Sequence, residues 1–337
     1  MHIVAATVRT LPLHQHMDWK DTVVQHVSAI NGKVYAISGK ASVYLIESDY
    51  LEEKPQKITV IYEGGAPVSC VDTAERNLAV LTTDGYIILI GLDSGSVSTR
   101  LAVPSGLELM KLHFALDESK LLTSGHDGAV HVCDTGSGIF STLPNIRVDH
   151  RDGELVKLSN NRILLSANND EMMIYDRTLM LAEILPVRVP SIRGRAFKAT
   201  ITGGALLEDG TVVAGTYDGM LFTLSPDLRK TTVYGRLHST GLLRNFIKRN
   251  DEEVVGIYGG SKDAGHVFHF SRDRGFVDLG RPRVIKDNIE LRDMDTEWAC
   301  IHYISSLAYD PDNDCLCVAS GEGYGCVVRY QGVAFPC

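Results

Sequence analysis

Four side chains in the second half of the chain are of types that carry out proton transfer: His302, Tyr303, Arg244 and Tyr258. A histidine or tyrosine can take a proton from a substrate while an arginine stabilises the negative charge that develops. This set would suit elimination or hydrolysis on an acidic carbohydrate. The chain holds 12 histidines, however, so that a histidine near an arginine is also expected by chance. We keep these residues as a catalytic alternative.

A second set of residues favours binding over catalysis. Two basic segments, 188–198 and 280–286, bring arginines together in an otherwise acidic chain, and guanidinium groups match the geometry of carboxylates and phosphates. A tryptophan near the second segment adds an aromatic residue of the kind that dominates protein interfaces. The alternative is a scatter of solvated side chains, some paired with nearby acids. The candidate binding residues are Arg193, Arg195, Lys198, Arg244, Arg283, Arg292, Trp298 and His302.

The cysteines and acidic residues do not form a recognisable metal motif. Cys315 and Cys317 are two residues apart on a predicted strand and therefore face the same side, with Cys300 and Cys326 nearby in sequence. Structural zinc sites use Cys-x-x-Cys spacing, which is absent, so we expect buried cysteines that pack as small apolar residues. The acidic run 310–314 lacks the glycine and glutamate of a calcium loop and is typical of a turn. We expect no metal and no cofactor.

The elements that must position these residues repeat along the chain. Seven times, at intervals of roughly forty to sixty residues, an apolar strand meets a tight polar turn and a second apolar strand. The clearest copy spans 121–134. Asp-Gly and similar pairs adopt the positive φ angles of hairpin turns, and the flanking strands are rich in valine, isoleucine and leucine. The seven turns contain Gly39-Lys40, Asp84-Gly85, Asp127-Gly128, Asn169-Asp170, Asp218-Gly219, Asp263 and Gly323-Tyr324-Gly325.

A fixed period of this size, with strands in every unit, predicts an all-β fold, a β-propeller of four-stranded blades. The chain stops soon after the third strand of the seventh copy, and an unassigned apolar stretch, 2–8, precedes the first. Pairing that stretch with the last blade would close the ring and cover an open strand edge. We expect seven blades closed in this way, forming a single domain over residues 1–337. Irregular strands within 276–302 would change the blade count.

The segment 121–134 resembles a WD40 repeat, since Cys133-Asp134, like Tyr175-Asp176, stands where that family has Trp-Asp. The resemblance covers most of the chain in period but only the middle blades in motif, and the family's Gly-His dipeptide and its tryptophan are missing. A diverged WD40 protein and a kelch-like or lyase-like propeller both remain open. The WD40 resemblance implies a non-catalytic scaffold, whereas the lyase-like one implies an enzyme.

Composition limits the function classes further. The net charge is −9 and the pI is near 5.7, which argues against an attraction of the whole protein to nucleic acid. The first residues do not resemble a secretory signal, and no apolar run is long enough to cross a membrane. An odd number of cysteines, 7 in all, fits reduced thiols and a cytoplasmic location.

The blade links that carry the basic segments join an outer strand to the next inner strand, on the face where propellers usually bind. We therefore predict a non-catalytic scaffold, monomeric outside its complex, that presents a partly basic loop face to a protein partner. An anionic ligand at the mouth of the central channel would suit the same residues. The alternatives are a propeller-fold lyase or hydrolase acting on an acidic carbohydrate, and a ligand-recognising accessory module.

Overall fold

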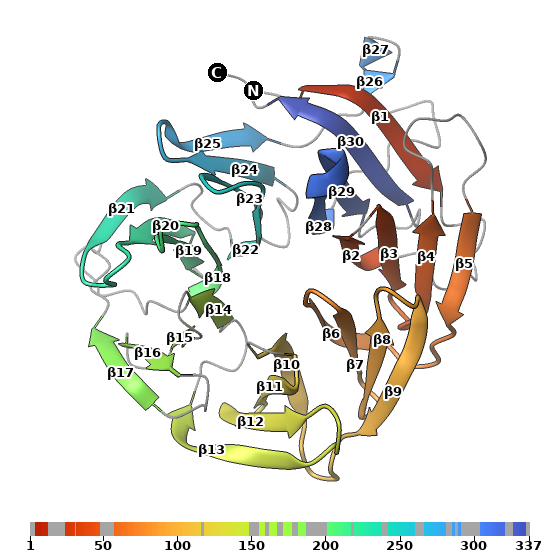
Figure 1. Ribbon diagram of the computed structural model, residues 1–337, viewed down its shortest axis with the longest axis vertical. Coiled ribbons are helices and arrows are strands. Elements are labelled where there is room, and N and C mark those ends of the chain that lie inside the picture. The colour runs from red at the N-terminus through yellow and green to blue at the C-terminus, as the bar shows by residue number, and fades with distance from the viewer. Residues whose placement is uncertain are drawn as a thin grey trace.

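The computed structural model places strands along the whole chain (Figure 1). It describes residues 4–12, 24–30, 32–47, 57–115, 118–147, 155–158, 162–166, 171–176, 181–186, 201–216, 219–236, 242–259, 266–280, 285–286, 289–290, 304–320 and 326–334. Within these ranges the strands form seven antiparallel sheets of four strands each and one small two-stranded sheet. The predicted all-β propeller fold is confirmed.

Six sheets each consist of four consecutive strands. Sheet 1 contains β2 (Val24–Ile30), β3 (Lys33–Ser38), β4 (Val43–Glu47) and β5 (Lys57–Tyr62), and sheet 2 contains β6 (Val68–Thr73), β7 (Asn77–Thr82), β8 (Tyr86–Gly91) and β9 (Ser96–Ala102). Sheet 3 contains β10 (Leu109–Phe114), β11 (Lys120–Gly125), β12 (Ala129–Asp134) and β13 (Phe140–Arg147), and sheet 4 contains β14 (Leu155–Leu158), β15 (Arg162–Ser166), β16 (Glu171–Tyr175) and β17 (Leu181–Pro186). Sheet 5 contains β18 (Ile201–Leu206), β19 (Val212–Thr216), β20 (Met220–Leu224) and β21 (Thr231–Arg236), and sheet 6 contains β22 (Leu242–Lys248), β23 (Glu253–Gly259), β24 (His266–Ser271) and β25 (Gly275–Gly280).

Sheet 7 is built from both ends of the chain. Its strands are, from the outside inwards, β1 (Val4–Pro12), β30 (Cys326–Ala334), β29 (Cys315–Ser320) and β28 (Ile304–Asp310). β1 runs antiparallel to β30, with Val8 opposite Tyr330. The two-stranded sheet, β26 (Ile285–Lys286) and β27 (Ile289–Glu290), lies in the segment that joins β25 to β28.

All seven predicted hairpins are present as paired strands. Three of the turns have the expected backbone: φ is +84° at Gly85, +77° at Gly128 and +82° at Gly219. In the turn at Gly128, Asp127 also accepts a hydrogen bond from the Ala129 amide at 3.0 Å. Turn chemistry thus fixes these three hairpins, as the sequence predicts.

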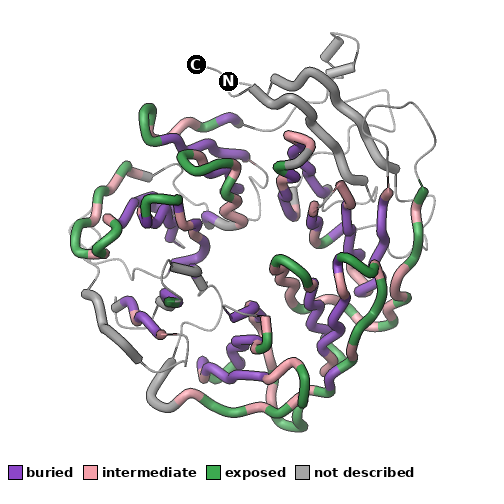
Figure 2. The backbone as a smooth tube through the Cα atoms, in the orientation of Figure 1, coloured by how far each residue is buried: buried purple, intermediate pink, exposed green. Residues whose placement is uncertain are grey.

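In sheets 1 to 6, the second and third strands carry most of the described core. In β7, for example, every residue after Asn77 is buried, because neighbouring sheets cover both faces. Figure 2 shows this arrangement, with buried residues on middle strands such as β7 and β8 and exposed ones on outer strands such as β9. Strands that are covered on both faces are apolar throughout. The apolar pattern of the sequence therefore predicts the second and third strands of the sheets.

Adjacent sheets share apolar clusters. Sheets 1 and 2 meet through residues such as Ile37 and Ile88, and sheets 2 and 3 through Leu81 and Phe114. Further clusters join sheets 3 and 4, sheets 4 and 5, and sheets 5 and 6. Each sheet is therefore stabilised mainly by the neighbour on either side, as expected of a repeat architecture.

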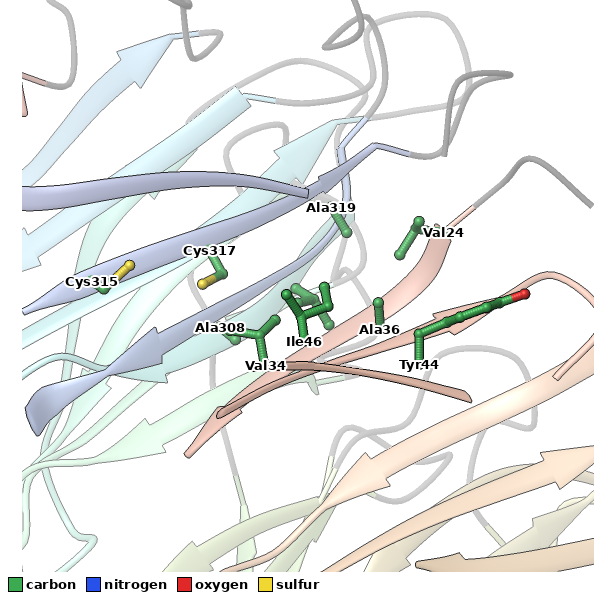
Figure 3. Close-up of a cluster of buried hydrophobic side chains, with 10 residues drawn as sticks. Val24, Val34, Ala36, Tyr44, Ile46, Ala308, Cys315, Cys317 and Ala319 are labelled. Atoms are coloured by element: carbon green, nitrogen blue, oxygen red, sulfur yellow. The ribbon is translucent and has the colours of Figure 1, made fainter. Parts of the chain in front are cut away.

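Sheets 1 and 7 share a cluster of the same kind (Figure 3). Val24, Ala36 and Ile46 of sheet 1 pack with Cys317 and Ala319 of β29, all of them buried. The inner strands β2 and β28 of these two sheets are also in contact. The beginning and the end of the chain are thus joined both by strand pairing and by an apolar interface.

Candidate functional site

Most of the predicted binding residues lie outside the described residues. This applies to Arg193, Arg195, Lys198, Arg283, Arg292, Trp298 and His302, and also to Tyr303 of the catalytic alternative. The segments that carry them join outer to inner strands, β17 to β18 and β25 to β28, as the sequence analysis requires. We use the name link face for one end of the propeller. It is the end where such links and the turns between second and third strands lie. The opposite end is the turn face.

For Arg244, the structure describes the position of the backbone only. It lies on β22 opposite Ile257, and the register of β22 with β23 shifts between Arg244 and Ile247. Asn245 within this bulge has a φ of +50°, and its side-chain amide donates to the Ser305 carbonyl at 3.4 Å. Bulges re-aim neighbouring side chains, and this one also ties sheet 6 to sheet 7.

Tyr258, the fourth residue of the catalytic alternative, is buried, with 2% of its surface exposed. Its hydroxyl lies 3.0 Å from Nδ1 of His266, and the two rings are 5.0 Å apart. Burial, and then the neighbouring Asp278 carboxylate, raise the pKa of the Tyr258 hydroxyl far above its usual range. Tyr258 therefore stays protonated and acts as a fixed hydrogen-bonding group within sheet 6, which is the opposite of what a catalytic base needs.

His266 and His269 point to different partners, as their spacing on an extended strand predicts. His269 is buried, and its Nε2 lies 3.4 Å from Glu253 Oε1. Burial lowers the pKa of His269. Glu253 also pairs with Arg249 at 3.1 Å, and Arg249 reaches Asp314 of sheet 7 at 3.5 Å. This network joins sheets 6 and 7 on the turn face.

A belt of polar side chains links the inner strands of successive sheets. Ser306 of β28 lies 3.3 Å from Nδ1 of His26, and Nε2 of His26 lies 3.3 Å from the Thr73 hydroxyl. On β6, Asp72 accepts a hydrogen bond from the Phe114 amide at 2.6 Å. Thr202 likewise donates to the Leu243 carbonyl of sheet 6. These groups are satisfied by neighbouring sheets, so their arrangement is structural.

Of the four cysteines whose side chains the structure describes, Cys133, Cys315 and Cys317 are buried and behave as small apolar residues. Cys315 and Cys317 are buried side chains of the cluster that sheets 1 and 7 share (Figure 3). Burial raises the pKa of the Cys133 thiol to about 11, which keeps it in the unreactive thiol form. Cys300 lies outside the described residues, as does the side chain of Cys326. In the described part of the chain, no group of three or more His, Cys, Asp or Glu side chains could hold a metal ion.

The acidic run 310–314 forms a turn between β28 and β29, with a short 3-10 helix at Pro311–Asn313. Asp310 is buried and accepts a hydrogen bond from the Asn313 side chain at 2.9 Å. Asp314 accepts one from the Tyr309 hydroxyl at 2.7 Å, besides its contact with Arg249. These carboxylates are used within the protein, as an ordinary turn requires.

Comparison with known proteins identifies the fold. The chain is similar to a solved structure described as the WD40 β-propeller domain of Doa1, with a TM-score of 0.60, at 16% sequence identity. The match covers 93% of this chain and 94% of that one. No family model and no curated protein matches the chain. No helix in the described ranges is long and apolar enough to span a membrane. The architecture is that of a WD40-type propeller.

Proposed function

We propose that this chain is a non-catalytic interaction scaffold, a seven-bladed WD40-like propeller closed by its N-terminal strand. Support for the closed ring comes from the antiparallel pairing of β1 with β30 and from the apolar cluster between sheets 1 and 7. Support for the scaffold role comes from the similarity to a WD40 domain over 93% of the chain. In such a protein the rigid sheets hold the links in place while the links vary.

The proposed contact surface is the link face between sheets 4 and 7. Arg193 and Arg195 belong to the link that precedes β18, Arg283 and Trp298 to the link that precedes β28, and Arg244 lies on β22. A cluster of arginines beside a tryptophan combines the residue types that dominate binding energy at protein interfaces. The partner surface is expected to be acidic, or to place an anionic group over the central axis.

The buried polar groups support binding over catalysis. The Tyr258 hydroxyl is engaged inside sheet 6, and the inner-strand residues His26 and Thr73 are bonded to each other. Tyr258 is the one residue of the catalytic alternative whose side chain the structure describes, and it is held by structural contacts. A rigid frame with varied links is what a scaffold requires.

The test is an affinity capture from lysate of the native host, with the purified chain as bait and mass spectrometry as the readout. The double variant Arg195→Glu, Arg244→Glu should lose a stoichiometric partner while its melting temperature stays unchanged. The matched control is Arg76→Glu, Arg229→Glu, which reverses two exposed charges on turns at the opposite end of the propeller. Capture that survives in the first variant, or that is lost equally in the control, would show that the proposed surface is wrong.

A further inference from the structure

Arg100 and Tyr86 form a stacked pair on sheet 2. The guanidinium carbon of Arg100, on β9, lies 3.7 Å from the centre of the Tyr86 ring, on β8. Arg100 is exposed and Tyr86 is half-buried. A cation over a tyrosine face is attracted by the electrons of the ring, and stacking leaves the N–H groups at the edge of the guanidinium directed outwards. The ring therefore fixes the direction in which Arg100 can donate hydrogen bonds.

Two of the described arginines form ion pairs that Arg100 does not form. Arg249 pairs with Glu253, and Arg272 pairs with Asp209. Throughout the described residues, no carboxylate lies within ion-pair distance of Arg100. Because Arg100 is exposed and stacked on Tyr86, with no described carboxylate beside it, its position suits an anion from outside the protein.

The pair lies near the link face, on the outermost strand of sheet 2. Tyr86 is the first residue of β8, directly after the Asp84-Gly85 turn, and Arg100 is near the end of β9. Among the described strands, β9 pairs with β8 alone. The open backbone groups of such an edge can pair with an extended segment from another protein.

An apolar side chain lies on the same side of β9. Val97 is 38% exposed and stands opposite Ile90, while Arg100 stands opposite Ile88. Both isoleucines belong to the cluster that sheet 2 shares with sheet 1, so the side chains of Val97 and Arg100 face in the same direction. A register shift in this ladder, between Leu89 and Ile90, brings residues three apart onto one side.

We propose that Arg100, stacked on Tyr86, recognises a carboxylate of a protein partner. The partner segment is extended and runs along β9, with an apolar side chain against Val97 and an aspartate, glutamate or terminal carboxylate at Arg100. The guanidinium fork gives two parallel hydrogen bonds to a carboxylate, and the exposed valine adds an apolar contact. This inference adds a second contact to the proposed scaffold function and rests on it.

The first experiment is selection of random dodecapeptides displayed on phage against the purified full-length chain. We expect enriched peptides that share one aspartate or glutamate next to an apolar position. Selection that yields no peptide above background, or only peptides without a carboxylate at a shared position, would overturn the proposal.

The second experiment measures the affinity of the best synthetic peptide by fluorescence anisotropy. Arg100→Gln should weaken binding at least about tenfold, because it removes a charge-assisted pair of hydrogen bonds. Arg100→Lys should lose part of that affinity, since it keeps the charge without the fork, and Tyr86→Leu should lose a similar part. The matched control is Arg229→Gln, another exposed arginine, which should bind like the unmodified chain.

The carboxylate itself is tested by changing the shared acidic residue of the peptide to its amide, which should cost the same factor as Arg100→Gln. Equal affinity for the Arg100→Gln variant, with an unchanged melting temperature, would contradict the proposal. These results are separate from the lysate experiment, since peptide binding uses the purified chain and is unaffected by changes at Arg195 and Arg244. The experiments can therefore contradict one proposed contact surface without contradicting the other.

Discussion

At the scale of single residues, several side chains that could do chemistry are used to hold sheets together. His26 is bonded on both ring nitrogens, by Ser306 of sheet 7 and Thr73 of sheet 2. Sequence reasoning did not single out His26, because nothing in its neighbourhood marks a residue that bridges sheets far apart in the chain. The cysteines were predictable, since strand residues without a ligand pattern are usually buried as small apolar groups.

His26 makes stability depend on pH in a defined window. Burial lowers its pKa from 6.5 to about 4, so that between these values the unfolded chain takes up a proton that the folded protein excludes. The contribution of neutral His26 to stability is complete above the pKa that this histidine has in the unfolded chain. It is lost as the pH falls towards the pKa of His26 in the folded protein. We expect it to reduce the free energy of unfolding by about 2 kcal/mol between about pH 7.5 and pH 5.

The measurement is urea unfolding of the unmodified chain and of His26→Gln at both pH values. Since His269 also has a lowered pKa, the difference between the two proteins is the quantity that isolates His26. The stability of His26→Gln should fall less on acidification. If both proteins lose the same free energy, His26 does not carry this dependence.

At the scale of elements, the central hairpins were predictable and the outer strands were not. The hairpins consist of unbroken apolar strands around turn residues, whereas β5 and β9 are largely exposed and mix polar with apolar residues. Outer strands are covered on the core side only in part, so their sequences carry a weak signal. The sequence does not single out Arg100 for this reason. Its proposed role depends on stacking with Tyr86, which lies on the neighbouring strand β8.

The turns between third and outer strands share a backbone feature. Gly95, Gly138 and Gly275 have φ values of +60°, +69° and +68°, and Leu228 has +60° at the corresponding place in sheet 5. Each glycine approaches an apolar side chain of the preceding sheet, as Gly138 does with Leu101. A glycine soon after the end of the third strand therefore marks the repeat in the sequence. It is a second marker beside Cys133-Asp134, which stands where WD40 repeats have Trp-Asp.

Gly138→Ala should destabilise the fold by about 1 kcal/mol, because an alanine side chain is strained at positive φ. A Cβ at this position would also lie 3.4 Å from Leu101 Cδ2. The neighbouring Gly136→Ala is the control, since its φ is not positive and a Cβ there would meet only the Asp134 side chain, at 3.6 Å. Chemical denaturation measures both, and equal effects would mean that φ at Gly138 is not the cause.

At the scale of the whole molecule, the repeat period predicted the propeller, because each unit must bury its faces against neighbours of the same kind. The sequence predicts the contact surface less directly than the fold. The links between sheets differ in length and sequence from one repeat to the next, so the repeat period does not predict which of their residues bind. The proposed closure of the ring leads to a prediction of its own. Deleting residues 1–12 would remove β1 and expose the edge of β30.

The truncated chain should melt at least about 5 °C lower and should form oligomers, since an open strand edge pairs with other chains. Differential scanning calorimetry and size-exclusion chromatography measure the two effects. Adding a synthetic peptide of residues 1–12 should restore the melting temperature by occupying the vacated edge. An unchanged melting temperature after the deletion would argue against closure through β1.

The pairing of β1 with β30 also fixes the order of events during synthesis. β1 leaves the ribosome before the other described strands, and its partner strand β30 follows only after all of them. Until then the nascent protein carries two incomplete strand edges, which is the condition under which newly made chains bind chaperones. When many copies are made at once, β1 of one molecule can pair with β30 of another, so that rapid expression should favour exchanged dimers over the self-closed protein.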